Sequence, residues 1–215
     1  MALRFNTHQK SVLFGILLGD AHLEYSPNRK TARLKIEQPK KHEAYIQYIY
    51  SIFKPWCSSE IYEYKGNLRF STQFCSSFKF YADQFYIHEQ NLGTNKKKGV
   101  PRLIHRWLNP VSLAHWYMDD GSINSKQSKA VLLNTHEFSF KEVNYLCSLL
   151  ESELFQLQCW PRKQKAKKCN EFHYQIYISG HSYERLKELI VGYIIPEMIY
   201  EFPNEKKRLT LLPKK

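Results

Sequence analysis

Two similar segments constrain the fold more than any other feature of the sequence. Each is an apolar run that ends in an acidic residue: LFGILLGDA contains Asp20, and LAHWYMDDG contains Asp120. The two acids lie 100 positions apart in a chain of 215 residues. A chain that repeats one pattern at such a spacing is expected to fold as two similar units. We therefore predict a duplicated architecture in which the two segments are equivalent helices.

The elements predicted after the two acids occur in the same order, which strengthens the repeat. Alternating apolar and polar residues predict strands, and apolar residues every three to four positions predict helices. After Asp20 these patterns predict a strand over 32–38, a helix over 42–53, two strands within 60–72 and a helix over 76–86. After Asp120 they predict a strand over 130–135, a helix from 139 to about 154, strands over 158–163 and 172–179, and a helix over 182–194. Each half is therefore predicted to be α-β-α-β-β-α, in an α+β fold with domains at 1–90 and 111–215 and a linker at 91–110.

The charge and aromatic content indicate a polyanionic partner. Lys and Arg number 32 and Asp and Glu 20, which gives a net charge of +12, and aromatic residues make up 15% of the chain. This combination is typical of proteins that bind nucleic acid. The five cysteines are an odd number without a CxxC pair, as in proteins of a reducing compartment. No apolar run approaches the ~20 residues that cross a bilayer, so we expect a soluble, intracellular protein with no membrane partner.

The acidic residues at the ends of the two predicted helices suggest a metal site. A carboxylate is unfavourable at a helix C-terminus, where the macrodipole is negative, unless a cation is bound there. Gly15 and Gly19 lie on one face of the first helix and would let a second helix approach closely. If the two helices pack together, Asp20 and Asp120 with nearby carbonyl oxygens suit Mg²⁺, and in a basic protein this suggests phosphodiester hydrolysis. The alternative is that each acid only caps the adjoining turn.

The two segments resemble the two motifs of the single-chain LAGLIDADG homing endonucleases, in the branch of the mitochondrial omega-intron endonuclease. Three further stretches fit that branch: VLLNT at 131–135, FSFKEV at 138–143 and IPEMIY at 195–200. The resemblance therefore covers nearly the whole chain. Two departures are Leu18, where the family name has an acid, and Ala21, which replaces the closing glycine.

The resemblance implies a fold and an activity. Two pseudo-symmetric halves would pack through the LAGLIDADG helices, and each would lay a saddle-shaped antiparallel sheet into the DNA major groove. The activity would be site-specific and divalent-metal-dependent cleavage of both DNA strands across the minor groove. It would leave short 3′ overhangs at a long, nearly asymmetric target. The cofactor would be Mg²⁺, as two or three divalent ions, with Mn²⁺ able to substitute and Ca²⁺ bound without supporting cleavage.

The resemblance also implies roles for residues at the ends of the motifs. Asp20 and Asp120 would bind the catalytic metal ions, helped by the backbone carbonyl of Gly19 or Asp119, and Asp119 is a second candidate acid. Lys98 falls where this branch has its first active-site lysine. The alternative for Lys98 is that it contacts phosphate, as one of three lysines at 96–98.

The position of the second active-site lysine departs from the family. Glu201 stands there, and Lys206 and Lys207 are the nearest candidates to replace it. If no lysine serves the second site, the two DNA strands should be cut at unequal rates.

Side chains that alternate toward one face of the predicted strands are candidates to read DNA. Arg pairs well with guanine and Gln with adenine in the major groove. In the first half the candidates are Lys35, Glu37, Tyr62, Tyr64, Arg69, Ser71 and Gln73. In the second half they are Arg162, Lys163, Gln164, Lys165, Lys167, Lys168, His173, Gln175 and Tyr177. Phosphate contacts are expected from Lys96, Lys97, Lys206, Lys207 and the basic run at 162–168. The alternative for any one of these residues is a solvated strand face.

Two other functions remain open from the sequence. One is a group I intron RNA maturase on the same fold, with intron RNA as partner. The other is a non-catalytic DNA-binding regulator, which usually carries an added helix-turn-helix module. A monomer is expected because both motifs lie in one chain. An excess of 23 Lys over 9 Arg is typical of AT-rich genomes and favours an organelle, mitochondrion or chloroplast, over the nucleoid or cytoplasm.

Overall fold

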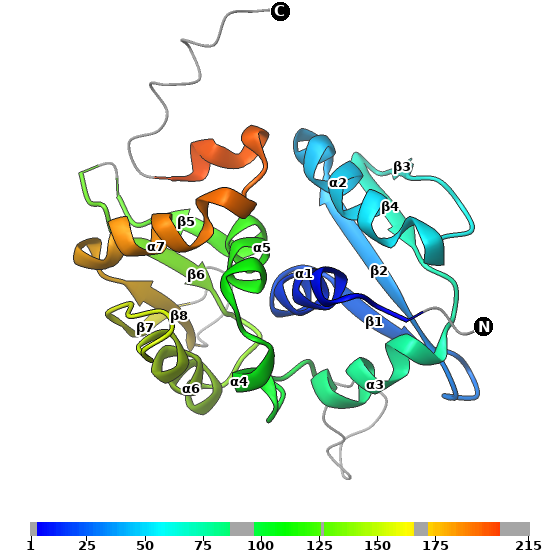
Figure 1. The fold of residues 1–215 in the computed structure, drawn as a ribbon, viewed down its shortest axis with the longest axis horizontal. Coiled ribbons are helices and arrows are strands. Elements are labelled where there is room, and N and C mark those ends of the chain that lie inside the picture. The colour runs from blue at the N-terminus through cyan, green and yellow to red at the C-terminus, as the bar shows by residue number, and fades with distance from the viewer. Residues whose placement is uncertain (1–3, 87–96, 126, 166–171, 203–215) are drawn as a thin grey trace, which may run out of the picture. The chain divides into compact units, whose positions relative to one another are not determined.

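The chain divides into two compact units, Met1–Trp107 and Leu108–Lys215. The computed structural model describes residues 4–86, 97–125, 127–165 and 172–202, without the side chains of 200 and 201 (Figure 1). None of the described helices is long and apolar enough to cross a bilayer.

The first unit is a four-stranded antiparallel sheet with its helices packed on one face. Its sheet order is β1-β2-β4-β3. The helices are α1 (Thr7–Leu18), α2 (Glu43–Phe53), α3 (Ser76–Phe85) and α4 (Ile104–Trp107), and the strands are β1 (His22–Tyr25), β2 (Ala32–Pro39), β3 (Tyr62–Tyr64) and β4 (Asn67–Ser71). Helix α1 is buried from Ser11 to Leu18, as expected for a helix that is apolar on all sides.

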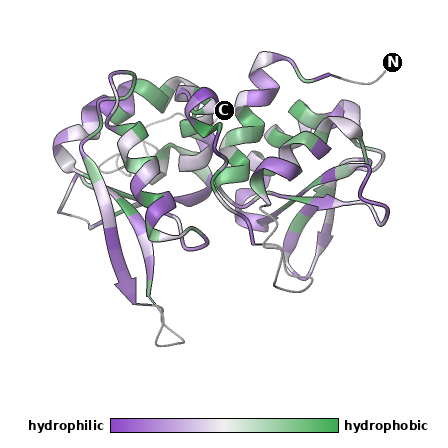
Figure 2. Cartoon of the chain, turned by 90° about the horizontal axis from the view of Figure 1, so that it is seen from below, coloured by the Kyte–Doolittle hydropathy of each residue, from purple (hydrophilic) through white to green (hydrophobic). Residues whose placement is uncertain are grey.

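The second unit repeats this plan. Its sheet order is β5-β6-β8-β7, again antiparallel throughout. The helices are α5 (Pro110–Asp120), α6 (Phe140–Leu150) and α7 (Tyr183–Ile190), and the strands are β5 (Gly121–Ile123), β6 (Val131–Asn134), β7 (Cys159–Lys165) and β8 (Phe172–Ile178). Figure 2 shows the end of β7 in purple, where its residues are hydrophilic.

The strand register makes the two units comparable residue by residue. His22 and Ser122 each lie two positions after a motif acid, and they pair with Lys35 and Leu132. Counting on by two from those partners, Glu37 pairs with Arg69 in the first unit and Asn134 pairs with Gln175 in the second. These two cross-strand pairs therefore occupy equivalent positions.

The structure confirms the α+β fold of two similar halves and adds one strand to each. Strands β1 and β5, directly after the motifs, make each half α-β-β-α-β-β-α rather than α-β-α-β-β-α, and the short α4 follows in the first unit. They are four and three residues long, too short to display the alternation by which a strand is recognised.

Two helices of the second unit end earlier than predicted. Helix α6 ends at Leu150 rather than near 154, and the amide of Leu157 returns to bond the carbonyl of Leu150 at 2.9 Å. Gln156 permits this reversal with a positive φ of 57°. Helix α7 ends at Ile190, and a 3-10 turn, Val191–Tyr193, follows it.

Candidate functional site

The first motif ends in a tight turn that presents Asp20. Asn6 begins α1 with a capping box, in which its side chain accepts from the amide of Gln9. At the other end the amide of Gly19 bonds the carbonyl of Gly15 at 3.2 Å, and the amide of Ala21 bonds that of Ile16 at 3.0 Å. Asp20 is exposed between the buried Gly19 and Ala21. The carboxylate therefore stands at the C-terminal tip of a buried helix.

Lys98 reaches this tip from a distant part of the chain. Its Nζ donates to the carbonyl of Gly19 at 2.5 Å and to that of Ala21 at 3.3 Å. Its backbone is held against the end of α3. Lys98 forms an isolated antiparallel β-bridge with Tyr86, and the amide of Gly99 donates to the carbonyl of Phe85 at 2.7 Å. An ammonium group beside a helix C-terminus is favourable.

Gln38 is a third member of this site, which the sequence analysis missed. Its Nε2 donates to Asp20 Oδ2 at 3.2 Å. Only 3% of Gln38 is exposed, since it lies on the core face of β2. His42 Nδ1 lies 3.3 Å from Gln38 Oε1. In the tautomer that is protonated at Nδ1, His42 donates a hydrogen bond to this oxygen. Burial, and then the nearby Lys41, lower the pKa of His42, against the opposing effect of Asp20.

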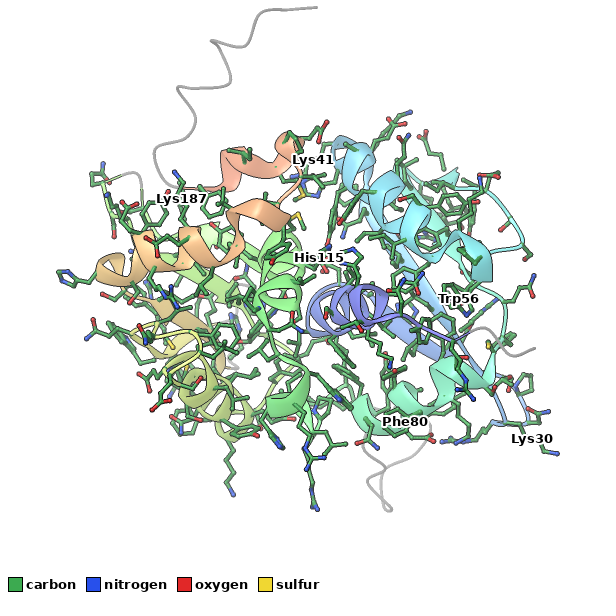
Figure 3. All side chains as sticks on the ribbon, in the orientation of Figure 1. Lys30, Lys41, Trp56, Phe80, His115 and Lys187 are labelled. Atoms are coloured by element: carbon green, nitrogen blue, oxygen red, sulfur yellow. The ribbon has the colours of Figure 1, made fainter. Side chains whose placement is uncertain are left out.

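The second motif ends without a comparable turn. Helix α5 begins at the Asn109 capping box and runs through Asp119 and Asp120, which are both partly exposed, into β5. Gly121 is required here, because a Cβ at this position would lie 2.3 Å from the carbonyl oxygen of Tyr117. His115, labelled in Figure 3, is buried in α5, and its Nδ1 lies 2.8 Å from the carbonyl oxygen of Val111.

A neutral amide holds the second motif where a lysine holds the first. Asn134 Nδ2, at the end of β6, donates to the carbonyl oxygen of Asp120 at 2.9 Å. The backbone of Glu201 lies in a 3-10 segment, Pro196–Glu201, which is followed by the buried Phe202 stacked on Tyr117 at 5.1 Å between ring centroids. The side chain of Glu201, together with Lys206 and Lys207, lies outside the described residues.

The first sheet presents most of the predicted DNA-reading residues on one face. Lys35, Glu37, Tyr62, Tyr64, Arg69 and Ser71 all share the face opposite the core, and Gln73 is exposed just beyond β4. The same face carries His22, Glu24, Arg33 and Asn67, which the sequence analysis did not include.

Charged side chains on this face pair with one another. Glu37 Oε1 accepts from Asn67 Nδ2 and Arg69 Nη2, both at 2.6 Å, and these bonds lower the pKa of Glu37. The guanidinium of Arg69 also lies 4.5 Å from the ring centroid of Tyr64. Glu24 forms an ion pair with Arg33, and Lys35 Nζ lies 3.7 Å from Glu24 Oε1.

The second sheet separates its candidates between two faces. Arg162, Gln164, His173, Gln175 and Tyr177 share one face. Because neighbouring residues of a strand point to opposite faces, Lys163 and Lys165 lie on the other one, where Lys163 Nζ is 4.0 Å from the ring centroid of Phe172.

Trp160 lies on the same face as Arg162 and Tyr177, and sequence reasoning missed it. It is 45% exposed and stacks on Tyr177 with ring centroids 4.7 Å apart. An exposed tryptophan on a predicted strand was the available signal. Of the predicted phosphate contacts, Lys97 is exposed, while Lys96, Lys167 and Lys168 lie outside the described residues.

Comparison with known proteins identifies the family of the chain. Residues 10–186 match the model of the LAGLIDADG DNA endonuclease family. This chain belongs to that family. A solved structure of the homing endonuclease I-WcaI bound to its DNA recognition sequence is 29% identical, with a TM-score of 0.76, and the match covers 93% of this chain and 87% of that one.

Two curated relatives are similar over most of this LAGLIDADG chain. DNA endonuclease I-ChuI of Chlamydomonas applanata is 29% identical over 213 residues, which cover 93% of this chain and 96% of I-ChuI. Cytochrome b mRNA maturase bI2 of Saccharomyces cerevisiae is also 29% identical over 213 residues, covering 93% of this chain but 48% of the maturase. The chain therefore spans nearly all of I-ChuI and about half the length of the maturase.

The donor set of the LAGLIDADG helix ends suits a metal site that is completed by a substrate. Within the described ranges, no cluster of three or more His, Cys, Asp and Glu side chains could hold an ion alone. The exposed Asp20 carboxylate is a hard oxygen donor, and so is the carbonyl of Gly19, one of whose lone pairs accepts from Lys98 Nζ. Mg²⁺ typically binds through one or two carboxylates, several waters and substrate phosphates. The residues present therefore fit an open site for this ion.

Proposed function

We propose that this chain is a site-specific, divalent-metal-dependent homing endonuclease that cuts both strands of a DNA duplex. The observation that carries the proposal is the convergence of three side chains from distant segments at the end of the first motif. Asp20 provides the carboxylate, Gln38 bonds that carboxylate, and Lys98 bonds the carbonyl of Gly19. Membership of the LAGLIDADG family and the similarity to I-ChuI and I-WcaI support it.

Each motif end would serve one DNA strand. Asp20 and Asp120 would hold Mg²⁺, with the carbonyls of Gly19 and Asp119 as further oxygen donors. Bound Mg²⁺ would supply an activated water and stabilise the leaving oxygen. Gln38 would keep the Asp20 carboxylate in one orientation, since its amide is buried and bonded to that group. Lys98 would place a positive charge beside the reacting phosphate and offset the negative end of α1.

The exposed faces of the two sheets would bind the DNA. Their candidates combine Arg and Gln side chains, which suit guanine and adenine, with exposed aromatic rings. The remaining lysines would contact phosphates, including those of the β7–β8 hairpin end. We propose further that the protein acts as a monomer, and an organelle is its expected location.

The test is a digest of genomic DNA from intron-free relatives in the presence of Mg²⁺, with new ends mapped by sequencing. One break with short 3′ overhangs is expected, abolished by chelation. Asp20→Asn and Asp120→Asn should each slow one strand by roughly 100-fold or more, because metal activation supplies several kcal/mol. A break that survives both substitutions would contradict the proposal.

A second candidate function is an intron RNA maturase, which the similarity to cytochrome b mRNA maturase bI2 favours. It would be supported by tight binding to the host intron transcript and by faster splicing in the presence of the protein. The Asp20→Asn protein separates the two activities, because splicing assistance should survive a substitution that removes DNA cleavage.

A further inference from the structure

Gln175 lies on the DNA-facing side of the second sheet but is not placed to read a base. Only 5% of the residue is exposed. Its Nε2 donates to Asn134 Oδ1 and lies 3.4 Å from His136 Nε2. An amide nitrogen has two hydrogens. One is donated to Asn134, and the second is donated to His136 in the tautomer whose Nε2 carries no hydrogen. A base contact through this nitrogen would require one of these interactions to break.

The bond from Gln175 continues to the end of the second motif. Asn134 accepts from Gln175 through Oδ1 and donates through Nδ2 to the carbonyl oxygen of Asp120, at 2.9 Å. One amide group thus links strand β8 to the last residue of α5. Thr135 Oγ1 also donates to the carbonyl of Tyr174 at 2.7 Å, which fixes the end of β6 against β8.

His136 and His173 form the outer side of this group. Their ring centroids are 4.0 Å apart. His173 pairs with Gln164 across β7 and β8, at the edge of the predicted DNA-facing surface. The chain of contacts therefore runs from that surface, through Gln175 and Asn134, to the motif carbonyl.

The first unit has no such chain at the equivalent positions. There the pair is Glu37 and Arg69, partly exposed and joined by an ion pair, and Asp20 is held instead by Gln38. At this position the polar residue is buried in the second unit and partly exposed in the first, which indicates a task specific to the second unit.

We infer that Gln175 is a positioning residue for the second metal site, acting through Asn134 on the carbonyl of Asp120. This inference rests on the proposed function. Side chains that orient metal ligands in this way typically contribute 10- to 100-fold to metal affinity or activity.

The experiment compares Gln175→Leu with Arg69→Leu, the matched change in the first unit. Strand-specific nicking is measured on a supercoiled plasmid that carries the mapped target. Gln175→Leu should slow the strand cut at the Asp120 site about tenfold and leave the other strand and the base preference unchanged. Arg69→Leu should alter base preference or affinity without slowing the Asp120-site strand selectively. Equal slowing of both strands by Gln175→Leu, or a changed base preference, would overturn the inference.

A double-substitution cycle tests the route through Asn134. If Gln175 acts only through Asn134, adding Gln175→Leu to Asn134→Ala should cause no further loss. Additive losses would show that Gln175 acts by another route and would overturn this assignment.

A readout without DNA or metal separates this inference from the proposed function. The side-chain amide of Asn134, followed by NMR, should exchange with solvent slowly in the wild type and in Arg69→Leu, and faster in Gln175→Leu. If the wild type cuts no DNA but this protection is seen, the proposed function fails and the link between Gln175 and Asn134 stands. If the wild type cuts DNA and Gln175→Leu leaves the protection unchanged, the inference fails alone.

Discussion

The two motif ends are held by different chemistry, although the elements around them repeat. At the first, a cation and a buried amide converge: Lys98 bonds the carbonyl of Gly19 and Gln38 bonds the Asp20 carboxylate. At the second, the neutral amide of Asn134 bonds the carbonyl of Asp120. Among the described residues, the elements around the two ends therefore match, while the groups that bond the end carbonyls differ in charge. Two halves that differ in this way are expected to cut their strands at different rates.

Among residues that support the carboxylates, the largest effect is expected from Lys98→Ala. Removing the ammonium should slow the strand cut at the Asp20 site by roughly 10- to 100-fold, the range typical of groups that support a metal site. The other strand should be unaffected, and strand-specific nicking of a supercoiled target measures both. Lys98→Arg keeps the charge and serves as the control. A loss shared equally by both strands would show that Lys98 stabilises the protein as a whole.

Glu201→Lys tests the difference between the two halves at the second motif. If the second site lacks a lysine, this change should speed the strand cut at the Asp120 site and bring the two rates closer. Wild-type rates that are already equal would contradict the predicted difference between the halves.

The last position of the motif, Ala21 in the first half and Gly121 in the second, should differ in how much a substitution destabilises the protein. Gly121→Ala should destabilise the protein by about 1–3 kcal/mol, as overpacking does, because the new Cβ would meet the carbonyl oxygen of Tyr117 at 2.3 Å. Ala21→Gly, the matched change in the first unit, should cost about 0.5–1 kcal/mol through added backbone entropy. Urea unfolding of both variants measures the two values. Equal costs would show that the helix ends pack alike.

The two sheet faces should differ in how they respond to salt. Arg69 is paired with the Glu37 carboxylate, whereas Arg162 donates to the neutral Asn124 at 2.5 Å. Strands β5 to β8 carry no Asp or Glu among the residues that the structure describes. Removing an unpaired phosphate contact lowers the salt slope of binding by about one unit. We expect this for Arg162→Ala and less than half of it for Arg69→Ala, measured by titration in Ca²⁺ at several salt concentrations.

The sequence predicts the fold well because apolar periodicity records which residues are buried. The sequence prediction missed Gln38. A polar residue at 38 continues the buried positions 32, 34 and 36 of the strand, and that break in the apolar pattern was a usable signal. The place of Lys98 came from the family resemblance, since nothing local marks a residue 79 positions from Gly19. Gln175 differs again, because alternation puts it on the sheet face that we propose binds DNA. Its side-chain amide, however, contacts Asn134 and His136 rather than being free to contact a base. Alternation along a strand does not encode such contacts.

The smallest effect concerns pH and separates the halves through His136. Burial, and then the nearby His173, lower the pKa of His136 below its ordinary value of 6.5. The unfolded chain therefore binds more protons than the folded one as the pH falls through 6.5, so stability is full above that value and decreases below it. In the tautomer whose Nε2 accepts from Gln175, protonation would also remove the accepting lone pair. We expect wild-type stability in urea to fall between pH 7.5 and 5.5, and to fall less in His136→Gln. An equal fall in both proteins would assign the pH dependence to other groups, such as His42, whose pKa is also lowered.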